Sequence, residues 1–265
     1  MKLYDAHNHL HDGRLASILD QILSELALIP LGGCVVNGTS EKNWSKVYSL
    51  STEYSWIRPA YGYHPWNLID ASPDWLIQLT ERLQVPGSSV GEIGLDRWKE
   101  VSNIQTQKKF FIEQLALAAT RNVPVSIHCL RAWEEMLHCL KNYPLPACGF
   151  LLHSFGGPEE MIKPLVALGG YFSFPGYYLT ERKGQSRELF KSIPIERILL
   201  ETDSPDQCLP IELDTYQLKN PDSGKRLNHP GNITSVYEGF AKFFGIGIEE
   251  IASVIEENFT RLFGE

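Results

Sequence analysis

The chain has 265 residues, 43% of them hydrophobic, and carries a formal net charge of −8. This length suits an α/β barrel of about 250 residues, so a single domain over residues 1–265 is predicted. No apolar run is long enough to span a membrane. The acidic balance argues against a surface that coats nucleic acid, because such binding depends on many lysines and arginines. A local anion site built on bound cations stays compatible with it.

Cysteine usage and the N-terminal residues both bear on the compartment. The five cysteines are scattered and include no Cys-x-x-Cys pair, which predicts reduced thiols rather than a disulfide framework or a structural zinc site. The N-terminus lacks the basic, apolar and small-residue order of a secretory signal. A cytoplasmic protein is therefore expected.

Short segments rich in apolar and β-branched residues recur about every 22 to 34 residues, the spacing of a strand followed by a helix. Between them, apolar residues recur with helical periodicity, as in the stretches 15–26 and 110–118. Eight such units favour a (β/α)8 TIM barrel with a parallel sheet inside over an open doubly wound sheet. The predicted strands cover roughly residues 3–9, 33–37, 57–63, 89–95, 123–128, 148–154, 170–174 and 197–203.

Two segments follow the last predicted strand. The chain from Pro205 to Asn232 contains four prolines and little periodicity, which predicts an extended loop over the barrel mouth. Residues from Ile248 to Leu262 return to helical spacing and predict a final helix. No glycine-rich dinucleotide or phosphate loop follows a strand, so a nucleotide-binding open sheet is the second choice.

Candidate metal ligands lie at the ends of the predicted strands. The first strand ends in His7 and His9, and residues i and i+2 of a strand point to the same side, so both rings can reach one ion. In a barrel the C-terminal strand ends surround one basin, so ligands from different strands can meet there. The further candidates, each at or near the end of another strand, are Glu92, His128, His153 and Asp203.

Four imidazoles and two carboxylates are enough for two divalent ions if one carboxylate bridges them. Glu92 is the predicted bridge, because it comes from the fourth strand, midway between the two groups of histidines. These donors and a phosphate substrate leave the metal open among zinc, magnesium, manganese, iron and nickel. The predicted ligands of one ion are His7, His9, Glu92 and Asp203, and those of the other are Glu92, His128 and His153.

Six motifs occur in order along the chain: His7-x-His9, Gly91-Glu92-Ile93-Gly94-Leu95-Asp96, Gln107 to Arg121 with Pro124-Val125-Ser126-Ile127-His128, His153-Ser154-Phe155-Gly156-Gly157, Glu201-Thr202-Asp203-Ser204-Pro205, and Asn258-x-x-Arg261-Leu262-Phe263. Together they resemble the TatD-related metal-dependent hydrolases, which belong to the amidohydrolase-like barrels. The resemblance covers nearly the whole chain, and the combination is more specific than any one motif. It implies a two-metal phosphodiesterase, usually a deoxyribonuclease of 3′ to 5′ polarity, with the six ligands in the roles given above.

The departures from the family pattern fall in loops. Arg97-Trp98 stands where the family usually has an aromatic residue, and the family's His-x-Arg appears as His128-Cys129-Leu130-Arg131. In the last loop, residues 226–230 replace an Arg-Asn-Glu-Pro pattern, and the insertion before them is longer than typical. No ligand is lost, so these changes bear on substrate preference rather than on the chemistry.

Several residues around the predicted basin are candidates for binding substrate. The resemblance places His64 near the substrate phosphate rather than among the ligands. Arg131 could pair with a phosphate through its planar guanidinium group, with a plain surface role as the alternative. Lys225 and Arg226 offer a similar contact from the loop, although such residues are more often solvated.

Aromatic residues also follow several strand ends. An exposed ring there could stack on an unpaired base, worth about 1 to 3 kcal/mol, although packing is the commoner role for tryptophan. His11 and Asp12 closely follow the first histidine pair, but they are not assigned as ligands because the set is already complete. The candidate rings are Trp66, Trp98, Trp133 and Tyr177.

Two ions about 3.5 to 4 Å apart activate water and offset phosphate charge, so hydrolysis of a phosphodiester such as DNA suits this site. Asp203 and Glu92 are the predicted catalytic residues, Asp203 as a ligand that also accepts the proton of the attacking water and Glu92 as the bridge. One alternative is an ester or amide hydrolase, for example of aminoacyl-tRNA, although many such barrels use a carbamylated lysine at the position of Glu92. A second alternative is a metal-stabilised binding protein without catalysis. The sequence leaves the oligomeric state open.

Overall fold

A computed structural model describes residues 1–98 and 103–264 of the chain. In it, eight parallel strands form one sheet in the order of the sequence, and each overlaps one of the predicted strand segments. The strand predictions are therefore confirmed. The strands are β1 (Leu3–Asn8), β2 (Leu31–Asn37), β3 (Ile57–Tyr61), β4 (Ser89–Asp96), β5 (Val125–Leu130), β6 (Phe150–Leu152), β7 (Gly170–Pro175) and β8 (Ile198–Glu201).

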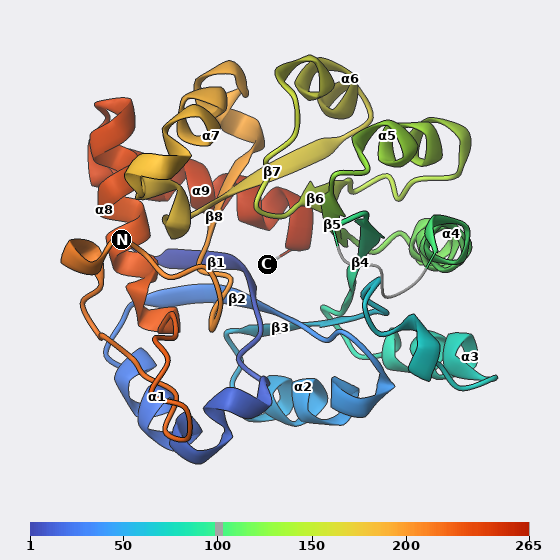
Figure 1. Ribbon diagram of the computed structural model, residues 1–265, viewed down its shortest axis with the longest axis horizontal. Coiled ribbons are helices and arrows are strands. Elements are labelled where there is room, and N and C mark those ends of the chain that lie inside the picture. Colours follow the sequence, from blue (N-terminus) through green and yellow to red (C-terminus); the bar gives the residue numbers. More distant parts are fainter. Residues whose placement is uncertain (99–102, 265) are drawn as a thin grey trace.

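The first and last strands lie side by side and close the sheet into a barrel (Figure 1). Two backbone hydrogen bonds join them just beyond β8: the amide of Asp203 donates to the carbonyl of His7 at 2.9 Å, and the amide of His9 donates to the carbonyl of Ser204 at 2.7 Å. Below these bonds, the buried carboxylate of Asp5 accepts from the amide and hydroxyl groups of Thr202. The predicted (β/α)8 TIM barrel is confirmed.

Helices surround the strands on the outside of the barrel (Figure 1). The periodic stretch 15–26 is divided between a 3-10 helix, η1 (Gly13–Ile18), and α1, while the predicted final helix is confirmed as α9. The α-helices are α1 (Leu19–Leu26), α2 (Glu41–Glu53), α3 (Trp75–Arg82), α4 (Ile104–Arg121), α5 (Trp133–Asn142), α6 (Ile162–Ala167), α7 (Gly184–Leu189), α8 (Ile233–Phe244) and α9 (Ile248–Phe263).

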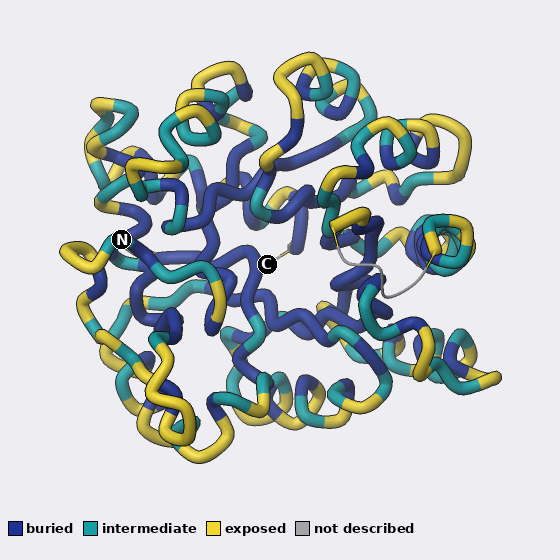
Figure 2. Tube along the Cα trace, in the orientation of Figure 1, coloured by how far each residue is buried: buried dark blue, intermediate teal, exposed yellow. Residues whose placement is uncertain are grey.

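The core lies between the strands and the inner faces of the helices. Figure 2 shows that the strands are buried along nearly their whole length, whereas the outer turns of the helices are exposed. Strands covered on both faces are expected to be continuously apolar, as in Phe150–Leu152 of β6. Among the described residues, no helix combines the length and apolarity needed to cross a membrane.

The segment 205–232 is more ordered than its weak periodicity predicts. It contains two 3-10 helices, η8 (Ile211–Leu213) and η9 (Pro230–Asn232), and an isolated antiparallel bridge between Lys219 and Arg226. Its first residues border the barrel mouth, whereas the remainder runs beside α1 (Figure 1).

Candidate metal centre

The fold brings all six predicted ligands to one end of the barrel. His128 and Glu92 lie within β5 and β4, His7 lies within β1, and His9 and His153 directly follow β1 and β6. Sharp turns begin at this rim: Arg131, Ser154 and Asp203 have φ values of 56°, 46° and 52°, in the left-handed region. Such strained backbone is concentrated at functional sites in proteins.

Four of the ligand atoms form a compact group beside β1. The Nε2 atom of His7 lies 3.3 Å from Nε2 of His9, 3.6 Å from Oε2 of Glu92 and 3.7 Å from Oδ1 of Asp203. Nε2 of His9 lies 3.4 Å from the same Glu92 oxygen and 3.5 Å from the same Asp203 oxygen. Neighbouring ligand atoms of a tetrahedral ion with bonds of about 2.0–2.1 Å lie about 3.3–3.4 Å apart. Each histidine nitrogen thus lies at or slightly beyond this spacing from both carboxylate oxygens, and His7, His9 and Glu92 form a group that could hold one ion.

A second group surrounds the other oxygen of Glu92. Oε1 lies 3.2 Å from Nδ1 of His128 and 2.9 Å from Nε2 of His153, and these two nitrogens are 3.2 Å apart. The two oxygens of one buried carboxylate thus face different histidines. Another possible group, His7, His153 and Asp203, joins residues that the prediction assigns to different ions, so the division into two ion sites stays a prediction. Rings of the two groups also touch, since His7 stacks on His153 with centroids 4.0 Å apart.

Hydrogen bonds at the outer ring atoms prepare two of the histidines as ligands. Nδ1 of His9 lies 2.8 Å from the carbonyl oxygen of Asn37, and Nε2 of His128 lies 3.0 Å from Oδ2 of Asp96. Both partners only accept, so these ring nitrogens carry protons and the opposite nitrogens are the ones that face the basin. Such outer partners orient metal-binding histidines and make them more basic.

His64 has the opposite arrangement. Its Nδ1 accepts a hydrogen bond from the backbone N–H of Trp66 at 3.2 Å, so the neutral ring carries its proton on Nε2. That Nε2 lies 3.5 Å from Oε1 of Glu92, and burial lowers the pKa of His64 to about 3 against the opposing effect of Glu92. His64 is thus a neutral hydrogen-bond donor beside the second group, although its ring lies within reach of an ion held by Glu92 and His128.

The carboxylates of the basin are ionised despite their burial. Burial alone raises the pKa of Glu92, but His64, His153 and His128 outweigh it and hold the pKa well below its usual range. Burial likewise raises the pKa of Asp203, but the hydrogen bond with His9 outweighs it and lowers the pKa to about 2. Conversely, burial lowers the pKa of His9, but Asp203 and Glu92 raise it to about 9. Two ionised carboxylates that stabilise the charged form of a histidine are suited to a bound cation.

Two supporting residues were missed from the sequence. Asp96 holds His128 and accepts from Nε1 of Trp66 at 2.8 Å, and its place four residues after Glu92 in β4 is a period-two signal that could have identified it. The Nε2 group of Gln207 donates to Oδ2 of Asp203 at 2.6 Å and to the hydroxyl of Ser154. No pattern in the sequence indicates this contact, because Gln207 lies in an irregular segment.

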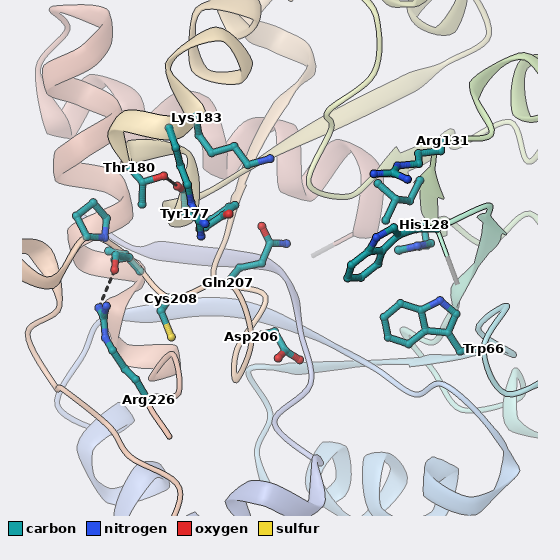
Figure 3. A pocket seen from close by; sticks show the side chains of 15 residues that line it. Trp66, His128, Arg131, Tyr177, Thr180, Lys183, Asp206, Gln207, Cys208 and Arg226 are labelled. Carbon is teal, nitrogen blue, oxygen red and sulfur yellow. Dashed lines mark hydrogen bonds between the residues drawn. The ribbon is translucent and has the colours of Figure 1, made fainter. Parts of the chain in front are cut away.

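A cavity of about 820 Å³ lies beside the metal-ligand cavity of about 270 Å³ (Figure 3). Arg131 and Arg226, two of the predicted substrate-binding residues, line the larger cavity. Arg226 also pairs with Asp214 at 2.7 Å. Lys225 is exposed and does not line this cavity within the described residues. The predicted rings that line it are Trp66, Trp98 and Tyr177.

The remaining candidates belong to neither ligand group, although the ring of His11 lies edge-on to that of His9 with centroids 5.8 Å apart. Trp133 packs edge-on against Phe155, with centroids 5.0 Å apart. His11 and Asp12 line a cavity of about 290 Å³ that shares His9, His64 and Glu92 with the metal-ligand cavity. Asp12 pairs with Arg14 at 2.8 Å. Neither residue joins a ligand group in the described part of the chain, which agrees with leaving them unassigned.

Comparison with known proteins identifies the family. A family model described as TatD related DNase matches residues 4–264. The chain belongs to the TatD-related family. A TatD relative from Bacillus subtilis strain 168, an uncharacterized metal-dependent hydrolase called YabD, is 31% identical over 98% of both chains. The 3′-5′ ssDNA/RNA exonuclease TatD of Escherichia coli K12 is 29% identical over 99% of both chains.

A solved TatD structure agrees with this assignment. The crystal structure of the TatD homologue YJJV from Escherichia coli K12 superposes with a TM-score of 0.87 at 26% identity, over 99% of this chain and 98% of that one. This chain is therefore a hydrolase of the TatD family, and its barrel is the TatD barrel.

Proposed function

We propose that this chain is a two-metal phosphodiesterase that removes nucleotides from the 3′ end of single-stranded DNA. The observation that carries the proposal is the position of Glu92, whose two oxygens face separate groups of histidines at 2.9–3.6 Å. The proposed ligands are His7, His9, Glu92 and Asp203 for one ion, and Glu92, His128 and His153 for the other.

Divalent ions in such a pair of sites supply the positive charge that activates water and offsets the charge of a phosphate. The chain's own groups do the remaining work. Asp203 is ionised and is the proposed acceptor of the proton of the attacking water, while Gln207 fixes its second oxygen. His64 presents an N–H donor to the basin and is the proposed contact to a phosphate oxygen.

The larger cavity supports a phosphodiester over a neutral ester or amide. Among the described residues, Arg131, Arg182 and Lys183 line this cavity and form no salt bridge within 4.0 Å, although the whole chain is acidic. Aromatic rings line the same cavity, and unpaired bases stack on such rings. Cations and rings together match a single nucleic-acid strand. The five free cysteines support a reducing compartment, and we propose the cytoplasm.

The test uses single-stranded DNA labelled at its 5′ end, incubated with the purified protein and Mg²⁺, Mn²⁺ or Zn²⁺ separately. A ladder that shortens from the 3′ end is expected with at least one metal. EDTA and the His128→Ala variant should abolish it, because EDTA removes the ions and His128 is a proposed ligand of the second group.

Protein shown to contain bound ions but unable to cleave DNA with any metal would contradict the proposal. Cleavage of an aminoacyl ester by that same preparation would then establish the ester hydrolase instead. A His128→Ala variant that keeps the activity of the wild-type protein would exclude the metal centre as the active site.

A further inference from the structure

One lysine connects the metal-ligand cavity with the larger cavity beside it. Lys183 ends the 3-10 helix η5 (Glu181–Lys183), which follows β7 and η4 (Gly176–Leu179). Among the described residues, it is the sole lysine or arginine that lines both cavities. Figure 3 shows its side chain extending from the side of Tyr177 toward the open space that Arg131 borders from the opposite rim.

The ammonium group of Lys183 is held in place without being neutralised. It lies 5.2 Å from the ring centre of Tyr177 and 5.3 Å from that of Tyr178, which are cation–π distances. Within the described residues it forms no salt bridge. Among the described residues, Asp206 is the one acidic residue that lines both cavities, and Arg14 binds both of its oxygens, at 2.8 and 2.7 Å.

The surroundings of Lys183 favour an incoming anion. Partial burial and the neighbouring Arg182 lower the pKa of its ammonium group, which means that the charged form lacks a compensating partner. A phosphate oxygen would supply that partner through a charge-assisted hydrogen bond. The position between the cavities places such a phosphate beside the metal centre rather than within it.

We propose that Lys183 binds the substrate phosphate next to the scissile one, so that the enzyme prefers phosphodiesters that carry a second phosphate on the neighbouring nucleotide. This inference rests on the proposed function. It names Lys183 as a specificity-determining residue, because ions held by the ligands would bind the scissile phosphate while Lys183 would bind the neighbouring one.

The test compares three dinucleotides: thymidylyl-thymidine, and the same compound with a terminal phosphate at either its 5′ or its 3′ end. For the wild-type protein we expect kcat/KM about tenfold higher on one phosphorylated form than on the unphosphorylated dinucleotide. Lys183→Met should lose this preference, so that its kcat/KM values for the three dinucleotides become equal within about twofold. For binding of the variant to longer single-stranded DNA, the slope of the logarithm of the association constant against the logarithm of the salt concentration should become shallower by about 0.7.

Two further variants serve as controls. Lys183→Arg keeps the charge and should keep the preference. Lys191→Met removes a nearby exposed lysine that pairs with Glu188 at 2.7 Å and lines neither cavity in the described residues, so it should behave as wild type.

The outcomes separate this inference from the proposed function. Wild-type protein that cleaves all three dinucleotides equally, or a Lys183→Met variant that keeps the preference, overturns the role of Lys183 alone. Wild-type protein that cleaves neither the dinucleotides nor labelled DNA overturns the proposed function, and this inference with it.

Discussion

At the scale of single residues, the orientation of His128 depends on a side chain outside the proposed ligand set. Oδ2 of Asp96 accepts from both Nε2 of His128 and Nε1 of Trp66, while Oδ1 accepts from the amide of Trp98 at 2.6 Å. All three donors face one carboxylate. An amide in its place would present N–H to one of them and leave that donor without an acceptor.

We therefore expect Asp96→Asn to weaken binding at the second ion group by about 10- to 100-fold, with a parallel loss of kcat. Calorimetric titration of the metal-free protein would measure the affinity. Asp70→Asn is the matched control, since Asp70 pairs with Lys42 on the surface, and it should leave the affinity unchanged. Wild-type affinity in Asp96→Asn would show that the ring needs no outer partner.

The candidate ligands could be predicted from the sequence because each lies at the end of a regular strand. Strand periodicity fixes where a strand ends and which way alternate side chains point. Gln207 and Lys183 could not be predicted in this way, since both lie in irregular segments whose course depends on tertiary contacts. The tautomer of His64 was also beyond prediction, because it depends on a backbone amide two residues away.

At the scale of elements, the segment 205–232 is fastened to the barrel by a buried histidine. His229 stacks on Tyr216 with centroids 4.0 Å apart, its Nδ1 accepts from the amide of Gly231, and its Nε2 lies 2.9 Å from Glu25 of α1. Burial lowers the pKa of His229 to about 4, although Glu25 opposes this shift. The folded segment therefore holds the neutral ring.

This anchor predicts a loss of stability in acid. The folded pKa lies below the unfolded value of about 6.5, so the stabilisation is complete above that pH and is lost as the pH falls from about 6.5 toward 4. Between about pH 7.5 and 5, His229 should account for about 2 kcal/mol of the decrease in the free energy of unfolding. Urea unfolding of His229→Gln should show a decrease smaller by that amount.

The exposed His138 of α5 offers a control for this measurement. His138→Gln should keep the pH dependence of the wild-type protein. Equal pH dependence in all three proteins would mean that His229 contributes nothing to acid sensitivity.

The elements themselves were predictable to different degrees. Strands covered on both faces leave continuous apolar runs, and the long helices α4 and α9 leave clear periodicity, so both kinds were found. The short helices were harder to predict, as the stretch 15–26 shows. Its apolar spacing suits one helix, but the structure places η1 before α1. The side chain of Asp12 caps the start of η1 by accepting from the amide of Arg14. Local capping bonds of this kind override periodicity.

At the scale of the whole molecule, the proposed ligands come from β1, β4, β5, β6 and β8, so they meet only in the closed barrel. Ions that bind the folded chain alone should stabilise it. At a free metal concentration of about 100 times Kd, the gain is about 2.7 kcal/mol, or roughly 5–10 °C in Tm.

Differential scanning calorimetry of metal-free protein with added Mn²⁺ or Zn²⁺ would measure this gain. Glu92→Gln should show a much smaller shift, because its neutral amide cannot bridge two ions. Equal shifts in both proteins would place the stabilising ion outside the Glu92 centre.

The seam between β1 and β8 also links the metal centre to the order of synthesis. His7 and His9 precede Asp203 by almost 200 positions in this chain, so a ribosome makes them well before the residues that follow the last strand. A nascent chain thus exposes two imidazoles long before their carboxylate partner exists. Chains cut short before β8 can neither close the seam nor complete the first ion group, so metal retained at that group is a sign that translation has passed the last strand.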